Sequence, residues 1–234
     1  MTDSHALRLP LAGTELDVVF HTPHHPRAWV VCLHGLESDK DGRKYFMLAD
    51  RLLPHGIGVV RFDFRGCGQS GGSFEDTNVG TRLEDARAVM EATRKQAGGS
   101  RLGLFGSSMG GFVGLFLTSE PGVAATVTLA APANLDDLVE RHQDQVDNLR
   151  AFAEEHRAGH YRKLPPTVPN LFLMHGSNDD VVPPAHARII ARHQVEPAGF
   201  RMFAGGDHRF SDPQHLDDAM QEAVDWFTGR LLNG

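Results

Sequence analysis

The sequence predicts one α/β domain over residues 1–234, with a mostly parallel sheet of about eight strands, helices on both faces and a small helical cap. The first observation behind this prediction is that short apolar runs alternate with longer segments of helical periodicity, as strands joined by crossover helices do. The second is the composition. The chain of 234 residues is 41% hydrophobic, enough for a sizeable core, and it has no internal repeat or low-complexity linker to divide it.

The predicted strands fall into two groups. The first two runs, 5–13 and 14–23, alternate in polarity and meet at Gly13, as the arms of a hairpin do, so we expect them to form an antiparallel edge. The other runs are continuously apolar and rich in β-branched residues, which is typical of strands buried in a parallel sheet. These runs cover 28–33, 56–64, 101–106, 124–131, 170–176 and 200–206.

Helical periodicity fills the segments between these runs. In 79–96, Leu83, Ala86, Val89 and Met90 fall on one face. The predicted helices cover 43–53, 79–96, 112–118, 185–193 and 216–232. Because crossover connections carry helices to either side of a parallel sheet, we expect both faces of the sheet to be covered.

The segment 134–166 is longer than a strand-to-strand crossover needs. Mostly apolar residues recur in it at helical spacing, which indicates mainly one amphipathic helix. They are Leu135, Leu138, Val139, His142, Val146, Leu149 and Phe152. This helix fits either an ordinary crossover packed on the core or a cap over a pocket at the carboxyl ends of the strands. The extra length and the Pro165–Pro166 exit favour the cap.

Charge and composition exclude several classes of function. A formal net charge of −7 with no basic run argues against binding to nucleic acid or to an anionic membrane, and no apolar stretch is long enough for a membrane span. Cys32 and Cys67 form no disulfide framework and the first residues show no signal peptide, so we expect a cytoplasmic protein. The cluster His21, His24 and His25 has prolines within it and no carboxylate or cysteine nearby, which favours a solvated turn over a metal site.

The stretch Gly106-Ser107-Ser108-Met109-Gly110 lies between a predicted strand and a predicted helix and has the pattern G-x-S-x-G. A tight turn in this context strains the central residue and projects its side chain above the sheet edge. Glycines two positions before and after are needed because strand and helix approach closely. Since Ser108 alone of the two serines has both glycines, we predict it as the nucleophile and expect Ser107 to pack or bond locally.

Two later residues complete a triad in chain order. Asp179 follows the predicted strand 170–176, with Asp180 as the competing choice, and His208 lies in the glycine-rich loop after the last predicted strand. Because parallel strands end at one sheet edge, these loops are expected to meet the turn at Ser108. The order serine, aspartate, histidine is that of a hydrolase triad on an α/β sheet.

An anion-binding pocket is the remaining requirement of acyl transfer, in which the carbonyl oxygen gains charge in the transition state. The segment His34-Gly35-Leu36 follows another predicted strand. We expect the backbone N–H groups of Leu36 and Met109 to hold the oxyanion, with His34 bracing the loop or simply occupying a turn.

The chain resembles the α/β-hydrolase superfamily over nearly its whole length. The motifs that carry the resemblance are "LHGLESDKD", "RFDFRGCGQSGGSFED", "GSSMGG", "HGSNDDVVP" and "GGDHRFSD". The second and the last of these are most similar to small bacterial carboxylesterases, including the cinnamoyl and feruloyl esterases. The resemblance implies Ser108 as nucleophile, Asp179 rather than Asp180 as acid, His208 as base, and Leu36 and Met109 as oxyanion-hole amides.

The resemblance implies a serine esterase that acts on a small-molecule ester through an acyl-enzyme, without metal or organic cofactor. The cinnamoyl esterases have a longer insert before the acid loop, so aromatic-ester specificity does not carry over. The apolar face of the cap with Phe152, and Phe210 near the base, suggest an apolar acyl or alcohol group; we predict both, with His34, as substrate-binding residues. The alternatives are the same triad acting on thioesters or on aminoacyl or peptide amides and, more distantly, a non-catalytic binding protein of the same fold.

Overall fold

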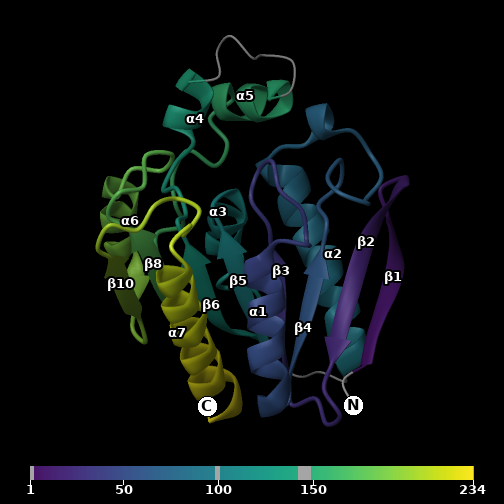
Figure 1. Ribbon diagram of the computed structural model, residues 1–234. Helices are drawn as coiled ribbons and strands as arrows, with labels where there is room; N and C mark the ends of the chain where they lie inside the picture. Colours follow the sequence, from purple (N-terminus) through teal and green to yellow (C-terminus); the bar gives the residue numbers. More distant parts are fainter. Residues whose placement is uncertain (1–2, 98–100, 142–148, 234) are drawn as a thin grey trace.

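An eight-stranded sheet runs through the centre of the computed structural model, which describes residues 3–97, 101–141 and 149–233 (Figure 1). Its strands lie in the order β1-β2-β4-β3-β5-β6-β8-β10. They are β1 (Asp3–Leu11), β2 (Thr14–Thr22), β3 (Ala28–Leu33), β4 (Ile57–Phe62), β5 (Arg101–Ser107), β6 (Val123–Leu129), β8 (Leu171–Gly176) and β10 (Gly199–Phe203).

The antiparallel edge predicted for the first two strands is confirmed. β1 and β2 form a hairpin in which Leu11 pairs with Thr14, and Gly13 takes the positive φ of +79° that the turn requires. β2 also runs antiparallel to β4, whereas every pair from β4 to β10 is parallel. β3 and β4 are buried along their whole length, as their continuous apolar sequence predicts.

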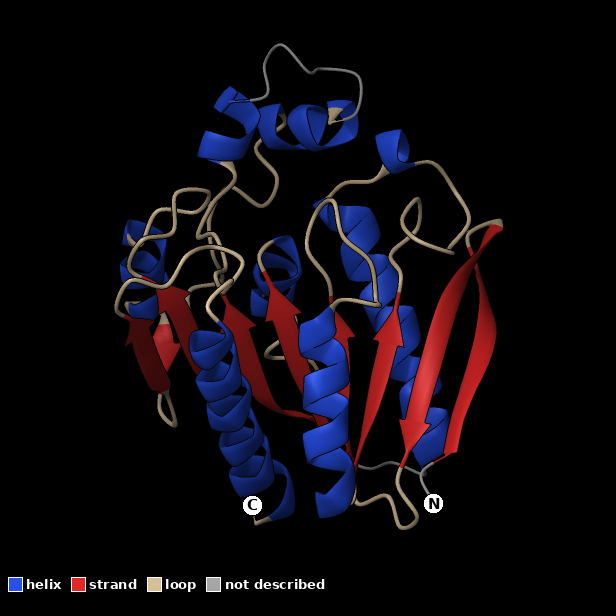
Figure 2. Cartoon of the chain, in the orientation of Figure 1, coloured by secondary structure: helices blue, strands red, loops and turns tan. Residues whose placement is uncertain are grey.

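Helices cover both faces of the sheet, as predicted (Figure 2). α1 and α7 pack on one face and share a buried cluster with the strands, and α2, α3 and α6 pack on the other face in a second cluster. The helices are α1 (Arg43–Leu52), α2 (Val79–Ala97), α3 (Met109–Leu115), α6 (Ala185–Ala191) and α7 (Pro213–Leu232). The smaller elements are the 3₁₀ helices η1 (Leu53–His55) and η2 (Phe74–Asp76) and the paired short strands β7 (Val168–Pro169) and β9 (Gln194–Val195).

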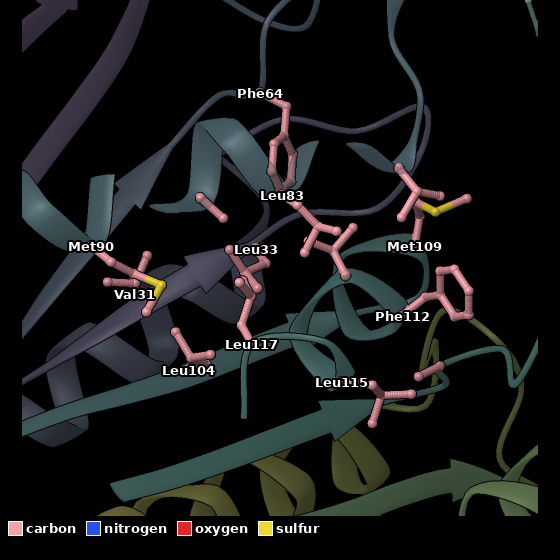
Figure 3. Packing of buried hydrophobic residues seen from close by; sticks show 14 of the residues in the cluster. Val31, Leu33, Phe64, Leu83, Met90, Leu104, Met109, Phe112, Leu115 and Leu117 are labelled. Carbon is pink, nitrogen blue, oxygen red and sulfur yellow. The ribbon is translucent and has the colours of Figure 1, made fainter. Parts of the chain in front are cut away.

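The larger buried cluster fixes α3 directly behind the sheet. Figure 3 shows Met90 of α2 beside Val31 of β3, and Phe112 of α3 beside Met109 at the start of the same helix; all four belong to this cluster. All of these side chains are almost completely buried. Because burial of one such side chain stabilises the fold by roughly 1.5–3 kcal/mol, the position of α3, and of the turn that precedes it, is strongly determined.

Two helices, α4 (Asp136–Arg141) and α5 (Arg150–Arg157), lie beyond the carboxyl ends of the strands (Figure 1). The sequence predicts mainly one helix here, and the structure corrects this to two. His142 and Val146 of the predicted helix lie outside the described residues. Leu135, Leu149 and Phe152 join the same buried cluster as α2 and α3, so the apolar spacing reflects packing on the body of the domain.

Polar contacts also hold this insert in place. The two carboxylate oxygens of Glu155 in α5 accept hydrogen bonds from the backbone N–H groups of Val79 and Gly80, each at 2.9 Å. These amides belong to the first turn of α2, where N–H groups lack partners within the helix. Glu155 therefore caps α2 from the insert. Within the insert, His156 Nε2 lies 2.9 Å from Asp136 Oδ1 and joins α5 to α4.

Candidate active site

The turn between β5 and α3 has the strained geometry expected of a nucleophile elbow. Ser108 has φ 53° and ψ −123°, in a region that residues with a side chain rarely adopt. A Cβ on Gly106 would lie 2.5 Å from the Gly110 carbonyl oxygen, and one on Gly110 would lie 2.1 Å from the Leu33 carbonyl oxygen. Both positions therefore exclude any side chain, which explains the spacing of the two glycines around Ser108.

The structure brings the three residues of the predicted triad together. His208 Nε2 lies 3.1 Å from Ser108 Oγ, and His208 Nδ1 lies 2.8 Å from Asp179 Oδ2. The three come from the ends of β5, β8 and β10 at one edge of the sheet. With the ring proton on Nδ1, His208 donates a hydrogen bond to Asp179, and Nε2 is free to accept a hydrogen bond from the Ser108 hydroxyl. The neighbouring Asp180 is exposed, whereas Asp179 is buried.

Asp179 is held as a carboxylate by several donors. Its Oδ1 accepts hydrogen bonds from the N–H groups of Val181 at 3.0 Å and Val182 at 2.7 Å, and its Oδ2 lies 3.3 Å from His175 Nε2. Burial raises the pKa of Asp179, but the hydrogen bonds from His175, His208 and the Val182 amide outweigh it and hold the pKa well below its usual range. Our sequence reasoning did not assign His175, although it stands four residues before Asp179 in the quoted motif.

His34 holds the loop after β3 in place through two hydrogen bonds. His34 Nε2 accepts a hydrogen bond from the Phe64 N–H at 3.0 Å, so its Nδ1 is the donor to the Gly35 carbonyl oxygen at 2.8 Å. Burial, with the nearby charge of Arg82, lowers the pKa of His34 to about 3, and the ring is neutral at physiological pH. Arg82 also donates to the carbonyl oxygens of Gly35 at 3.4 Å and Leu36 at 3.2 Å.

Leu36 and Met109 both line a cavity of about 590 Å³ that contains Ser108 and His208. Met109 is the first residue of α3, where the N–H has no partner within the helix and is suited to an anion. The other lining residues are Gly35, Glu37, Ser38, Lys44, Ser107, Pro132, Asn134, Leu135, Val181, Val182, His186 and Arg209. The cavity therefore lies over the strained serine, with Leu36 of the β3 loop and Met109 of α3 in its wall.

His34, Phe152 and Phe210 are not among the residues that line this cavity. Phe152 is buried in the larger cluster, with the Arg82 guanidinium 5.7 Å from its ring centroid. Phe210 is buried against Phe203, at 5.2 Å between ring centroids. The structure thus places these three side chains in the packing around the cavity, and their contact with substrate stays a prediction. We predicted Phe210 as a substrate contact because it lies two residues after His208 in the sequence. The Phe210 side chain instead packs in the buried cluster that contains α7.

Lys44 also lines the cavity, and it comes from α1, which packs on the face of the sheet opposite to α3. Its Nζ donates a hydrogen bond to Ser107 Oγ at 2.8 Å, and burial lowers the pKa of Lys44 to about 8. Ser107 is thus occupied by a local hydrogen bond, as expected from its place in the turn. Lys44 was not singled out in the sequence, because a lysine in a predicted helix is usually solvated.

No group of three or more His, Cys, Asp or Glu side chains suited to a metal ion occurs in residues 3–97, 101–141 and 149–233. His24 and His25 of the histidine cluster are exposed, and His21 Nε2 accepts a hydrogen bond from Arg61 Nε at 2.9 Å. Of the helices in the described part of the chain, none combines the length and hydropathy of a membrane span.

Comparison with known proteins places the chain in a family. Residues 24–154, more than half of the chain, match the family described as serine aminopeptidase, S33. Lysophospholipase L2 of Escherichia coli (strain K12) is 32% identical over 122 residues, which are 49% of this chain and 35% of that protein. The match thus spans about a third of the length of this curated relative.

Solved structures agree on the fold. Est1E of Butyrivibrio proteoclasticus, solved with bound ferulic acid, superposes with a TM-score of 0.83 at 17% identity, covering 98% of this chain and 100% of that one. The esterase Pf2001 of Pyrococcus furiosus gives a TM-score of 0.78 at 19% identity, covering 98% of this chain and 94% of that one. The chain has the α/β-hydrolase fold and belongs to the serine aminopeptidase S33 family.

Proposed function

We propose that the chain hydrolyses carboxylic esters through an acyl-enzyme on Ser108. The observation that carries this proposal is the continuous hydrogen-bonded path Ser108–His208–Asp179, 3.1 Å and 2.8 Å long in its two steps, that opens into the cavity. Such a path activates a serine hydroxyl, which is otherwise a weak nucleophile. Two proteins to which the chain is similar are named as an esterase and as a lysophospholipase, and both names denote hydrolysis of an ester.

The proposed steps follow from the positions of these side chains. His208 Nε2 accepts the hydroxyl proton as Ser108 Oγ attacks the acyl carbonyl, and Asp179 stabilises the imidazolium that forms. The N–H groups of Leu36 and Met109 are the proposed donors to the oxyanion. His208 then gives its proton to the leaving alcohol, and water releases the acyl group by the same acid–base cycle.

Hydrolysis of an aminoacyl amide is the second candidate, favoured by the description of the family as aminopeptidases. Such a substrate carries an α-ammonium group, which an acidic residue recognises. Among the described residues that line the cavity, Glu37 is the one carboxylate, against the cations Lys44 and Arg209. This charge balance favours neutral or anionic substrates, and we rank the ester first. Thioesters share the acyl chemistry and belong to the same test.

Replacement of each serine in turn tests the proposal. We expect Ser108→Ala to lower kcat/KM for p-nitrophenyl butyrate by about 10³-fold or more, whereas Ser107→Ala keeps activity within about tenfold because its hydroxyl only accepts from Lys44. An alanyl p-nitroanilide and a butyryl thioester, assayed beside the ester, rank the bond types. The reverse behaviour of the two variants would contradict the assignment of the elbow.

Covalent labelling separates the enzyme from a non-catalytic binding protein. A fluorophosphonate that reacts with activated serines is expected to add one adduct, which mass spectrometry of peptides places on Ser108. No adduct on Ser108 in the folded protein would favour the binding protein.

A further inference from the structure

Lys44 is placed where a solvated lysine would not be. It is the second residue of α1, it is half-buried, and its side chain lies at the wall of the active-site cavity. Its Nζ lies 2.8 Å from Ser107 Oγ and 5.8 Å from the centroid of the Tyr45 ring. Lys44, Ser107 and Ser108 line the same cavity, so the charge of Lys44 is held in the wall that also contains the proposed nucleophile.

Among the side chains that the structure describes, no carboxylate lies at ion-pair distance from Lys44 Nζ. The hydroxyl of Ser107 and the ring of Tyr45 are neutral partners. The first turn of α1 contains no acidic residue, and the amino terminus of a helix already carries a partial positive charge. Burial lowers the pKa of Lys44 to about 8, so in most protein molecules Lys44 is still charged near pH 7.

Lys40, four residues earlier, is a buried lysine whose charge is compensated within the protein. Its Nζ lies 2.8 Å from both Asp17 Oδ2 and Asp63 Oδ2 and 3.6 Å from Asp41 Oδ2, so three carboxylates surround one ammonium group. Buried charges are normally compensated in this way. The contrast indicates that the anionic partner of Lys44 is supplied from the cavity.

Other charges around the cavity are consistent with an anionic partner. Arg209 is exposed and lines the same cavity next to His208, and Glu37 is exposed at the rim. Among its described residues the wall thus carries two basic side chains, Lys44 and Arg209, against one acidic side chain, Glu37, and the most buried of the three is Lys44.

We propose that Lys44 is a specificity-determining residue, which binds an anionic group of an ester whose scissile carbonyl lies at Ser108. The substrate class is an ester with a free carboxylate or an equivalent oxyanion on its acyl side, within a few bonds of the carbonyl. This inference rests on the ester hydrolysis proposed above. Ser107 holds the ammonium group in place until the substrate replaces or shares that hydrogen bond.

Two esters that differ only in the remote charge test this inference. Mono-p-nitrophenyl glutarate has a free carboxylate, and its methyl-capped diester has none, while leaving group and chain are the same. We expect the wild-type protein to have a kcat/KM for the charged ester about tenfold or more above that for the capped one. Lys44→Met is expected to lower this ratio by about tenfold or more, and Lys44→Arg to keep part of it. The matched control is Arg43→Met, which removes an exposed cation from the adjacent position of α1.

Each outcome decides one of the two proposals. A ratio that Lys44→Met leaves unchanged, or a wild-type preference for the capped ester, would overturn the role of Lys44 while ester hydrolysis stands. If neither ester is hydrolysed, ester hydrolysis fails, and binding then decides the role of Lys44. Calorimetry of mono-p-nitrophenyl glutarate with Ser108→Ala is expected to give a Kd about tenfold lower than with the Ser108→Ala, Lys44→Met protein. Equal affinities would refute the anion site.

Discussion

Removing the charge of Lys44 is expected to stabilise the folded protein. Burial lowers the pKa of Lys44 from 10.5 to about 8, and a tenfold change in proton affinity corresponds to about 1.4 kcal/mol, so the charge costs roughly 3 kcal/mol before screening. The open side of the cavity screens part of this, and loss of the hydrogen bond to Ser107 offsets about 1 kcal/mol. We therefore expect Lys44→Met to raise the free energy of unfolding by about 1–2 kcal/mol near pH 7 and Tm by roughly 3–6 °C.

The dependence on pH identifies the cause. Between the folded-state pKa of about 8 and the ordinary value of 10.5, the unfolded chain keeps a lysine proton that the folded chain has released. The stability conferred by this site in the wild-type protein consequently rises with pH over that interval. Because Met does not titrate, the advantage of Lys44→Met should be largest below pH 8 and shrink towards pH 10.5.

Urea unfolding of both proteins at about pH 7 and about pH 10, followed by fluorescence, measures this difference. Lys40→Met is the contrasting variant, because it leaves Asp63 buried without a cation and Asp17 with only the more exposed Arg8, and it should lose about 3–5 kcal/mol. A Lys44→Met protein that is less stable than wild type near pH 7, or an advantage that does not change with pH, would refute the reasoning.

Two further predictions concern stability, and each has a control on the same helix. Gly110→Ala places a Cβ 2.1 Å from the Leu33 carbonyl oxygen and should lower the free energy of unfolding by about 3 kcal/mol or more. At Gly114 the nearest atom to an added Cβ lies 3.5 Å away, so Gly114→Ala should raise the free energy of unfolding by about 0.5–1 kcal/mol. Thermal unfolding measures both changes, and a Gly110→Ala protein as stable as wild type would contradict the close approach. Glu155→Ala removes the two hydrogen bonds to the start of α2 and should lower the free energy of unfolding by about 1–2 kcal/mol. The control Glu154→Ala, at an exposed position, should lower it by less than about 0.5 kcal/mol. Equal losses of stability in urea unfolding would show that Glu155 does not cap α2.

The sheet, and the meeting of Ser108, Asp179 and His208 at one edge of it, could be predicted because both depend on local patterns repeated along the chain. Each parallel strand is a continuous apolar run, and each loop that carries Ser108, Asp179 or His208 directly follows such a run. Once the strands are parallel, their carboxyl ends meet at one edge whatever the details of packing. The glycines around Ser108 add a steric requirement that is visible in the letters alone.

Contacts between distant segments could not be predicted in the same way. The position of Lys44 against Ser107 depends on how α1 packs on the sheet, and the donors from Arg82 to the β3 loop depend on α2. Phe152 and Phe210 show the same limit from the other side, since proximity in the sequence does not fix the direction of a side chain. Helical spacing in the insert predicted burial correctly at Phe152 but not which surface would cover it.

The two adjacent serines of the elbow are best understood through the charges that each contacts. Ser108 Oγ lies 3.1 Å from His208 Nε2, and His208 Nδ1 lies 2.8 Å from Asp179 Oδ2, the arrangement on which the proposed proton transfer rests. Ser107 is buried, and its hydroxyl accepts from a cation that no described carboxylate neutralises. An uncompensated buried charge lowers stability, so its presence next to the proposed nucleophile is expected where it binds a substrate anion. On this reasoning Ser107→Ala should change which acyl groups are preferred more than how fast the bond is broken.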